Sequence, residues 1–332
     1  MSKGDYLYTV DPASTSMFLR ECREGARATV TSQLEEGVFL LHTSAEFRPL
    51  FARHRFRIDG AVEFDGLERL PGFTLPGQGA FGFQLRANHR LSTGFKEIAE
   101  AWARSLELSP ERIDVRAPQN VVSGYFYHSE RTDSVRLYYG LSLVADNLSP
   151  WAGGFCRIPL SENALSRAEQ KLLEALELEG KRIPRGGLAL DLGAAPGGWT
   201  RVAAEMGFQV HAVDPADLHS SLRLHPRVTH HRTTAGEFIK QARGPFDLLL
   251  CDMKMEAKLA VDLVLEYASV LSPNAFLVMT LKLPKKERAL LAARQALRRI
   301  EKRFSVMVGR QLYFNRSEIT IVARRASQDD AT

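Results

Sequence analysis

The chain has 332 residues, of which 45% are hydrophobic, so it is long enough to form two ordinary domains, each with its own core. Its formal net charge of +5 is modest for this length and argues only weakly for a polyanionic partner. The three cysteines lie far apart, without Cys-x-x-Cys or Cys/His spacing, which argues against a metal site or a disulfide framework and fits a reducing cytoplasm. No apolar run approaches ~18 residues and the first ten residues lack a signal-peptide core, so we expect no membrane span.

The first half of the chain is predicted to form an α+β region without a cofactor motif. Strands are expected at residues 6–10, 38–43, 81–87, 112–116 and 135–143, with a helix at 95–106. The Gly- and Pro-rich residues 64–82 are expected to join two subdomains, 1–65 and 66–152. Residues 146–154 are expected to link this region to a second domain at 153–326, which a flexible tail at 327–332 follows.

In the second half, strand and helix patterns alternate, as is typical of a parallel sheet covered on both faces. Strands are expected at residues 188–192, 209–213, 246–251 and 275–280, with helices at 199–206 and 260–271. Residues 305–308 and 318–323 are expected to close the sheet as an antiparallel pair. We therefore predict an α/β fold with a doubly wound, Rossmann-like sheet of the methyltransferase type.

The segment LALDLGAAPGGWT, residues 188–200, leads from an apolar strand into a glycine-rich turn. Glycine lets a ligand approach the backbone closely, but the Gly-Lys-Ser/Thr of a triphosphate loop and the Gly-x-Gly-x-x-Gly of a dinucleotide fold are both missing from the segment. A carboxylate beside such a turn suits a cationic amino-acid group, so we predict an S-adenosylmethionine loop, with an ordinary βα turn as the alternative. The residues expected to contact the cofactor here are Asp191, Gly193, Ala195, Pro196, Gly197, Gly198 and Trp199.

Further polar residues stand at the carboxyl ends of the expected strands, where ligands bind in open α/β sheets. Asp214 is expected to accept hydrogen bonds from ribose hydroxyls of the cofactor, with helix capping as the alternative. Asp252 ends the next strand and Lys282 follows the last parallel one. Methyl transfer to a neutral hydroxyl requires in-line placement and loss of the hydroxyl proton, and a lysine whose pKa is lowered by burial or cationic neighbours can assist.

In chain order, Lys171, Asp252, Lys282 and Glu318 resemble the Lys-Asp-Lys-Glu tetrad of FtsJ-like RNA ribose 2′-O-methyltransferases. The segments DLGAAPGGWT, CDM, LKLPKKER and RQLYFNRSEITIVARR are similar to bacterial members of that family that act on large-subunit (23S) ribosomal RNA and carry an N-terminal THUMP region. The likeness is strong over residues 165–325. It is faint before them, where FQLRANHRLSTGFKEIAEAW resembles a THUMP domain, a module that docks RNA.

The resemblance implies that Lys282 is the base or activating cation for a ribose 2′-hydroxyl, that Asp252 holds it, and that Lys171 and Glu318 orient the ribose. It also implies S-adenosylmethionine as cofactor, a cytidine in 23S ribosomal RNA or its precursor particle as substrate, and a cytoplasmic enzyme. We expect a monomer and no membrane or metal partner. Residues expected to contact RNA phosphates are Lys285, Lys286 and Arg288, with a second basic patch at residues 48–57.

One departure from the family pattern concerns the adenine of the cofactor. Where such enzymes often present an acid, this chain has Thr233 and Thr234, so Thr234, or failing it Glu237, is the expected contact. Two functional alternatives stay open: the same chemistry on transfer RNA or another RNA, and a noncatalytic RNA-binding or ribosome-assembly protein that retains the fold. A base methyltransferase is disfavoured because the chain has no Asn-Pro-Pro-Tyr motif and Cys251 falls in a buried strand.

Overall fold

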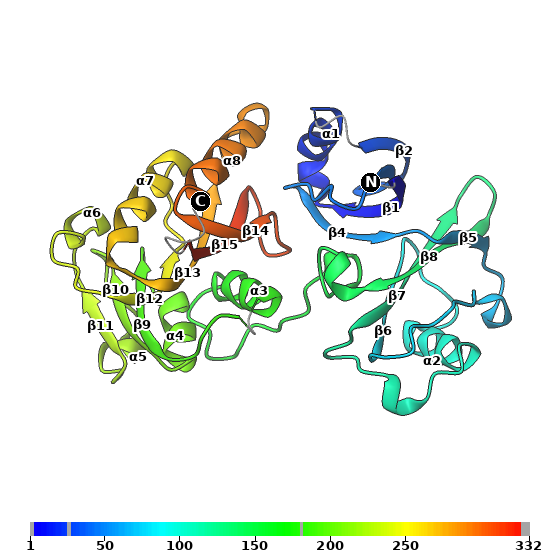
Figure 1. The fold of residues 1–332 in the computed structure, drawn as a ribbon, viewed down its shortest axis with the longest axis horizontal. Coiled ribbons are helices and arrows are strands. Elements are labelled where there is room, and N and C mark those ends of the chain that lie inside the picture. Colours follow the sequence, from blue (N-terminus) through cyan, green and yellow to red (C-terminus); the bar gives the residue numbers. More distant parts are fainter. Residues whose placement is uncertain (1–2, 25–27, 180–181, 327–332) are drawn as a thin grey trace. The chain divides into compact units, whose positions relative to one another are not determined.

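The computed structural model describes residues 3–24, 28–179 and 182–326, so the predicted tail lies outside the described residues. The chain divides into two compact units, Met1–Phe155 and Cys156–Thr332, which are described separately below (Figure 1). The sequence had placed this boundary between residues 152 and 153. Among the described residues, no helix is both long and apolar enough to cross a membrane.

The first sheet of the N-terminal unit is antiparallel, with strand order β2-β3-β1-β4. Its strands are β1 (Lys3–Val10), β2 (Ala28–Glu35), β3 (Val38–Ser44) and β4 (Ala52–Arg57). Helix α1 (Thr15–Glu24) contributes the fully buried Phe18, whose ring packs 5.2 Å from that of Phe39 on β3. The unit's fold therefore begins with an ordinary helix-on-sheet core.

The second sheet of this unit has the order β5-β8-β7-β6. It contains β5 (Gly60–Glu63), β6 (Phe81–Ala87), β7 (Asn120–Ser129) and β8 (Ser134–Leu143). Strands β6 and β7 run parallel, and the chain between them includes α2 (Phe95–Ser105), as a parallel crossover requires. Trp102 of α2 is fully buried and its indole N–H donates to the carbonyl of Pro71, so residues 64–82 pack as part of this core.

Several predictions for the N-terminal unit are wrong. Residues 112–116 do not form a strand: the 3-10 turn Pro110–Arg112 precedes a single bridge from Ile113, and the Asp114 carboxylate accepts N–H bonds from Arg116 and Ala117, which turns the backbone instead. The sequence also missed α1, β2, β4, β5 and β7. Because β5 pairs with β8, the two sheets divide before residue 60 rather than at 65.

The expected linker is corrected, and so is one residue of the expected basic patch, whose Arg48 and Arg57 are exposed. Residues 146–154 pack into the N-terminal unit, where the amide of Asn147 donates to Gln84 and the hydroxyl of Thr9 to the Gly153 carbonyl. Within residues 48–57, Arg55 is buried and donates to the carbonyls of Ala45, Phe47 and Asp146. Its charge is used inside the fold and is not presented to a partner.

The C-terminal unit is one seven-stranded sheet with the order β11-β10-β9-β12-β13-β15-β14. The first five strands in that order are parallel, and β15 runs antiparallel to both of its neighbours, which confirms the predicted closing pair. The strands are β9 (Gly187–Leu192), β10 (Phe208–Val213), β11 (Val228–His231), β12 (Phe246–Cys251), β13 (Leu271–Lys282), β14 (Phe304–Arg310) and β15 (Glu318–Arg325).

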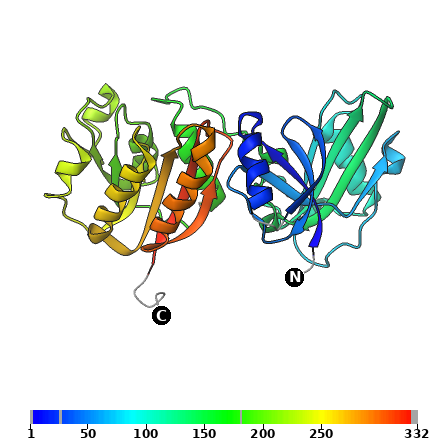
Figure 2. The ribbon, with the colours of Figure 1, turned by 90° about the horizontal axis from the view of Figure 1, so that it is seen from above.

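Helices cover both faces of this sheet, with α3 packed beside α4 and α7 beside α8 (Figure 2). Their bounds are α3 (Glu169–Glu179), α4 (Gly198–Glu205), α5 (Ser220–Arg223), α6 (Ala235–Phe238), α7 (Ala257–Tyr267) and α8 (Lys286–Ile300). The central strands are apolar along both faces because both are covered. The doubly wound prediction is confirmed, although α7 ends at Tyr267, before the expected residue 271, which already belongs to β13.

Candidate active site

The carboxyl ends of the parallel strands bring the predicted polar residues to one edge of the sheet. Asp191 lies on β9, opposite Ala212 of β10 and Leu250 of β12, while Asp214 and Asp252 directly follow those two strands. Lys282 ends β13, beside β12. A ligand at this edge would therefore meet all four residues, as open α/β sheets lead one to expect.

The glycine-rich turn after β9 has a backbone that only glycine adopts readily. Gly193 has φ +76° and Gly197 has φ +113°, both in the left-handed region. A Cβ on Gly197 would lie 2.2 Å from Leu222 Cδ1, and one on Gly193 would lie 2.6 Å from Met253 Cγ. Gly197 is also the N-cap of α4 and supplies no side-chain cap, while the backbone of Thr200, in the first turn of that helix, faces the Asp191 carboxylate.

Asp191 is the most deeply buried carboxylate of this edge, with 1% of its surface exposed. The hydroxyl of Thr200 on α4 donates to its Oδ2 at 2.6 Å. Burial raises the pKa of Asp191 to about 7; the bond from Thr200 opposes the rise, while the charges of Asp252 and Asp214 add to it. A positively charged group placed against Asp191 would restore its ionised form, which suits the predicted cationic end of a cofactor.

Asp214 is already engaged by the backbone. Its Oδ2 accepts from the N–H of Ala195 at 3.1 Å and its Oδ1 from that of Ala216 at 2.8 Å. The carboxylate thus ties the glycine turn to the end of β10 and caps neither α4, whose N-cap is Gly197, nor α5, whose N-cap is His219. Each of its oxygens keeps a second lone pair for the expected cofactor hydroxyls. Pro196, between Ala195 and Gly197, follows a cis peptide bond in the same turn.

Two residues expected to contact the cofactor form structural hydrogen bonds within the protein. Trp199 is 4% exposed, packs in the core and donates its indole N–H to the Ala168 carbonyl at 2.8 Å, so its side chain joins α4 to the start of α3. Thr234 is the N-cap of α6 and forms a capping box with Glu237, whose carboxylate also accepts from Thr233. The Thr234 hydroxyl and the Glu237 carboxylate therefore take part in the helix cap, and a contact of either with adenine stays a prediction.

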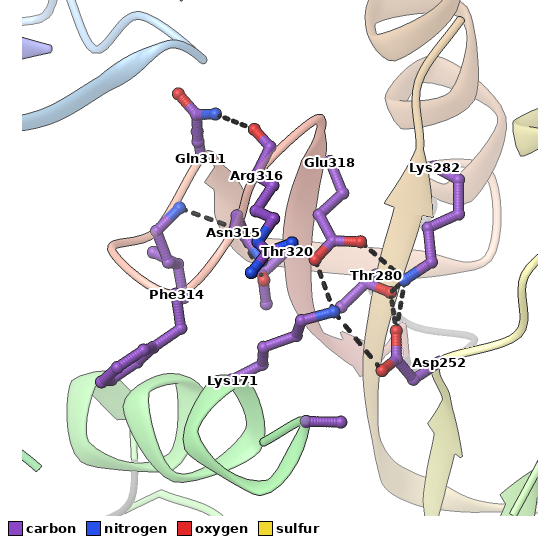
Figure 3. A network of polar contacts seen from close by, with 12 residues as sticks. Lys171, Asp252, Thr280, Lys282, Gln311, Phe314, Asn315, Arg316, Glu318 and Thr320 are labelled. Atoms are coloured by element: carbon purple, nitrogen blue, oxygen red, sulfur yellow. Dashed lines mark hydrogen bonds and ion pairs between the residues drawn. The ribbon is translucent and has the colours of Figure 1, made fainter. Parts of the chain in front are cut away.

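The predicted tetrad is assembled from four separate elements (Figure 3). The Nζ atom of Lys171 lies 2.5 Å from Oε1 of Glu318 and 3.6 Å from Oδ2 of Asp252. The Nζ atom of Lys282 lies 2.7 Å from Oε2 of Glu318 and forms a short hydrogen-bonded ion pair with Oδ1 of Asp252. Each ammonium thus bridges the same two carboxylates in a four-membered ring of alternating charge.

Strand pairing and one helix explain this assembly. The antiparallel register of β13 and β15 sets Lys282 directly opposite Glu318. Lys171 comes from α3, and the Glu174 carboxylate, one turn further along, accepts the backbone N–H groups of Tyr313 at 2.8 Å and Phe314 at 3.0 Å. The helix is therefore tied to the loop that leads into β15, so α3, which carries Lys171, and β15, which carries Glu318, are held together.

Two opposing influences set the pKa of Lys282. Burial does lower this pKa, but the charges of Asp252 and Glu318 and the hydrogen bonds to them outweigh it, so the pKa is raised. In this arrangement Lys282 is a firmly protonated cation. The structure consequently favours the activating cation over the base among the two roles inferred from the sequence.

The basic residues that follow Lys282 differ in how far the structure describes them. Lys285, the N-cap of α8, and Arg288 are both exposed. The side chain of Lys286 lies outside the described part of the chain. Among the described residues, no group of three or more His, Cys, Asp or Glu could hold a metal ion.

Sequence reasoning missed Thr280 and Thr200, whose hydroxyls donate to Asp252 and Asp191 respectively. The signal for Thr280 was available, because residues two apart on a strand share a face and Thr280 precedes Lys282 by two. The sequence held no specific signal for Thr200, since a threonine in the first turn of a helix can have several structural roles.

Comparison with known proteins identifies a family match in the C-terminal unit. Residues 164–316 match the family described as FtsJ-like methyltransferase. "Ribosomal RNA large subunit methyltransferase M" of Laribacter hongkongensis is 35% identical over 190 residues, 53% of this chain and 52% of that protein. The protein of the same name from Halorhodospira halophila is 38% identical over 178 residues, 53% of this chain and 51% of that one.

This chain thus spans about half the length of the curated relatives that it matches. Among solved structures, a Methanococcus jannaschii fibrillarin pre-rRNA processing protein aligns with a TM-score of 0.42 and 14% identity, over 49% of this chain and 77% of that one. The resemblance drawn from the motifs is confirmed for the C-terminal unit, and residues before 164 lie outside the family match.

Proposed function

We propose that this chain, whose residues 164–316 form an FtsJ-like methyltransferase domain, methylates a ribose 2′-hydroxyl in large-subunit ribosomal RNA with S-adenosylmethionine. The observation that carries the proposal is the closed ring of Lys171, Asp252, Lys282 and Glu318 at the ligand-binding edge of the sheet. Two ammonium groups and two carboxylates meet there within salt-bridge distance. The glycine turn follows β9, whose carboxyl end lies at the same edge.

The residues of that edge fit the cofactor. Gly193 and Gly197 leave two positions of the turn without a Cβ atom, and Asp191 offers a buried carboxylate that a cationic amino group would stabilise in its ionised form. Asp214 provides further acceptors, and the N-terminus of α4, which begins directly after the turn, provides backbone donors. S-adenosylmethionine, when bound, supplies an electrophilic methyl group on a sulfonium.

The tetrad would support attack by an alcohol, because a ribose bound at this edge would have a cation beside the oxygen that must become nucleophilic. Lys282 is protonated, and it would orient the 2′-oxygen and stabilise the negative charge that develops as the O–H bond breaks. Asp252 and Glu318 keep the ammonium in place, and Lys171 balances their charge. The overall reaction exchanges the hydroxyl proton for the methyl group and releases that proton to solvent.

The substrate class rests on the family and on the named relatives. FtsJ-like domains and the two relatives above point to ribosomal RNA of the large subunit, and a cytidine is the nucleotide we propose. Lys285 and Arg288, exposed just beyond Lys282, would contact phosphates. The N-terminal unit, with its own two sheets, is proposed to dock the RNA as a THUMP-like region, and the enzyme to act in the cytoplasm as a monomer.

The test uses purified protein, S-adenosylmethionine with a tritiated methyl group, and total RNA or precursor particles from a strain that lacks the gene. We expect label at a single large-subunit position, mapped by primer extension sensitive to 2′-O-methylation. Label in transfer RNA would keep the chemistry and change the substrate. Cofactor binding by calorimetry without label in any RNA or particle would contradict the enzyme and leave a noncatalytic RNA-binding protein.

A further inference from the structure

Thr280 is a fifth polar residue inside the proposed catalytic ring. It lies on β13, is 1% exposed, and points to the same side of the strand as Lys282 because the two residues are two apart (Figure 3). Its hydroxyl forms a short hydrogen bond with Oδ1 of Asp252 and lies 2.6 Å from Nζ of Lys282. Lysine, carboxylate and threonine therefore form a closed triangle.

The number of N–H and O–H protons determines which group donates in each hydrogen bond of that triangle. A lysine ammonium has three N–H donors and no acceptor, and Lys282 meets three acceptors: Asp252, Glu318 and the Thr280 oxygen. Thr280 therefore accepts from Lys282 and gives its single proton to Asp252. Two of the three partners of the ammonium are carboxylates, and only the Thr280 hydroxyl is uncharged.

The uncharged partner is the one that a substrate oxygen can replace at least cost. Breaking a buried ion pair costs more than giving up a hydrogen bond to an uncharged hydroxyl, even when the donor of that hydrogen bond is an ammonium. A ribose 2′-oxygen that needs an N–H of Lys282 would thus take the one that Thr280 accepts. Thr280 would keep its bond to Asp252, so the carboxylate would stay in place through the exchange.

We propose that Thr280 is a positioning residue of the active site, which fixes Lys282 and Asp252 relative to each other and yields one lysine N–H to the ribose 2′-oxygen. This inference rests on the proposed function, because it assigns Thr280 a part in that reaction. Thr280 acts through its neighbours and need not touch the substrate.

The chain offers a matched control on the neighbouring strand. Thr320 is paired with Thr280 in the β13/β15 register and is also 1% exposed. Its hydroxyl donates to Oδ1 of Asn315 at 3.0 Å, in the loop before β15, and not to the tetrad. Thr→Val substitutions at the two positions therefore remove the same group from similar buried surroundings, with only one of them inside the ring.

The first experiment measures kcat, KM for RNA and the pH profile of kcat for T280V, T280S and T320V. We expect T280V to lower kcat by about tenfold to a hundredfold with KM within twofold, because misplacement of the reacting groups affects the chemical step. T280V should also shift the pH profile, T280S should recover most of the loss, and T320V should keep the wild-type profile. A T280V enzyme with wild-type kcat and profile, or equal losses in T280V and T320V, would overturn the assignment.

A second measurement needs no RNA and separates this inference from the proposed function. In protein labelled with ¹⁵N at lysine Nζ, the signal of Lys282 is identified by its absence in the Lys282→Met variant. We expect its ammonium protons to exchange with water several-fold faster in T280V than in the wild type or T320V, since one of three hydrogen bonds is lost. Equal exchange rates would refute the positioning role, whereas absence of methyl transfer by the wild type would refute only the proposed function.

Discussion

At the scale of single residues, the charge of Lys282 is set by its two carboxylate neighbours. We predict that Lys282→Met, which keeps most of the side-chain volume, lowers methyl transfer by at least about a thousandfold, because the developing oxyanion loses its cation. Binding of S-adenosylmethionine should change by less than threefold, since the glycine turn lies between β9 and α4, whereas Lys282 lies on β13. Single-turnover assays and calorimetry measure the two effects, and a variant that retains turnover would remove Lys282 from the mechanism.

Asp191 gives a second prediction, on stability. Its native pKa of about 7 exceeds the unfolded value of about 3.9, so its stabilising contribution is complete below pH 4 and is lost as the pH rises through 7. The side chain of the Asp191→Asn variant does not titrate. The free energy of unfolding of this variant, relative to that of the wild type, should therefore rise by about 2–4 kcal/mol between pH 4 and pH 8. Thermal melts of both proteins across this range test it; a constant difference in Tm would show that Asp191 is not strained in its charged form.

At the scale of elements, α3 is held to the loop before β15 by one carboxylate. Glu174→Ala would leave the partly buried N–H groups of Tyr313 and Phe314 without this acceptor, which should cost about 1–3 kcal/mol of unfolding free energy. Because the same loop delivers Glu318, we expect kcat to fall as well. The matched control is Glu177→Ala, an exposed position on the same helix; equal denaturation midpoints for the two variants would contradict the anchoring role.

Strands and helices could be predicted where apolar and polar residues recur in the sequence with a simple period. The strands and helices of the C-terminal unit follow from apolar runs that end in polar residues, and their order follows from the rule that parallel strands need helical crossovers. Strand β7 was missed although it is central, because its many small and polar residues do not alternate. Residues 112–116 look like a strand, but Asp114 gives the backbone a turn that the alternation of side chains does not reveal.

At the scale of the whole molecule, each unit has its own sheets and its own buried core. We predict that residues 156–332, produced alone, fold cooperatively and bind S-adenosylmethionine within about threefold of the full chain. Their kcat/KM for RNA should fall by at least about tenfold, because the proposed docking unit is removed. Circular dichroism, calorimetry and methylation assays check the three statements in turn. Full kcat/KM without the first 155 residues would deny that unit a part in RNA binding.

The sequence by itself determined the fold of the C-terminal unit and the glycine turn, since these depend on local periodicity and on residue types in a fixed order, whereas the four residues of the tetrad came from the resemblance to FtsJ-like enzymes. Only the tertiary structure decided how those residues behave. The pairing of β13 with β15 surrounds Lys282 with two carboxylates and raises its pKa, and the capping of α6 occupies Thr234. Burial turns Trp199 and Arg55 into structural residues. Charge state, burial and hydrogen-bond partners depend on segments distant in the chain, so no local pattern reports them.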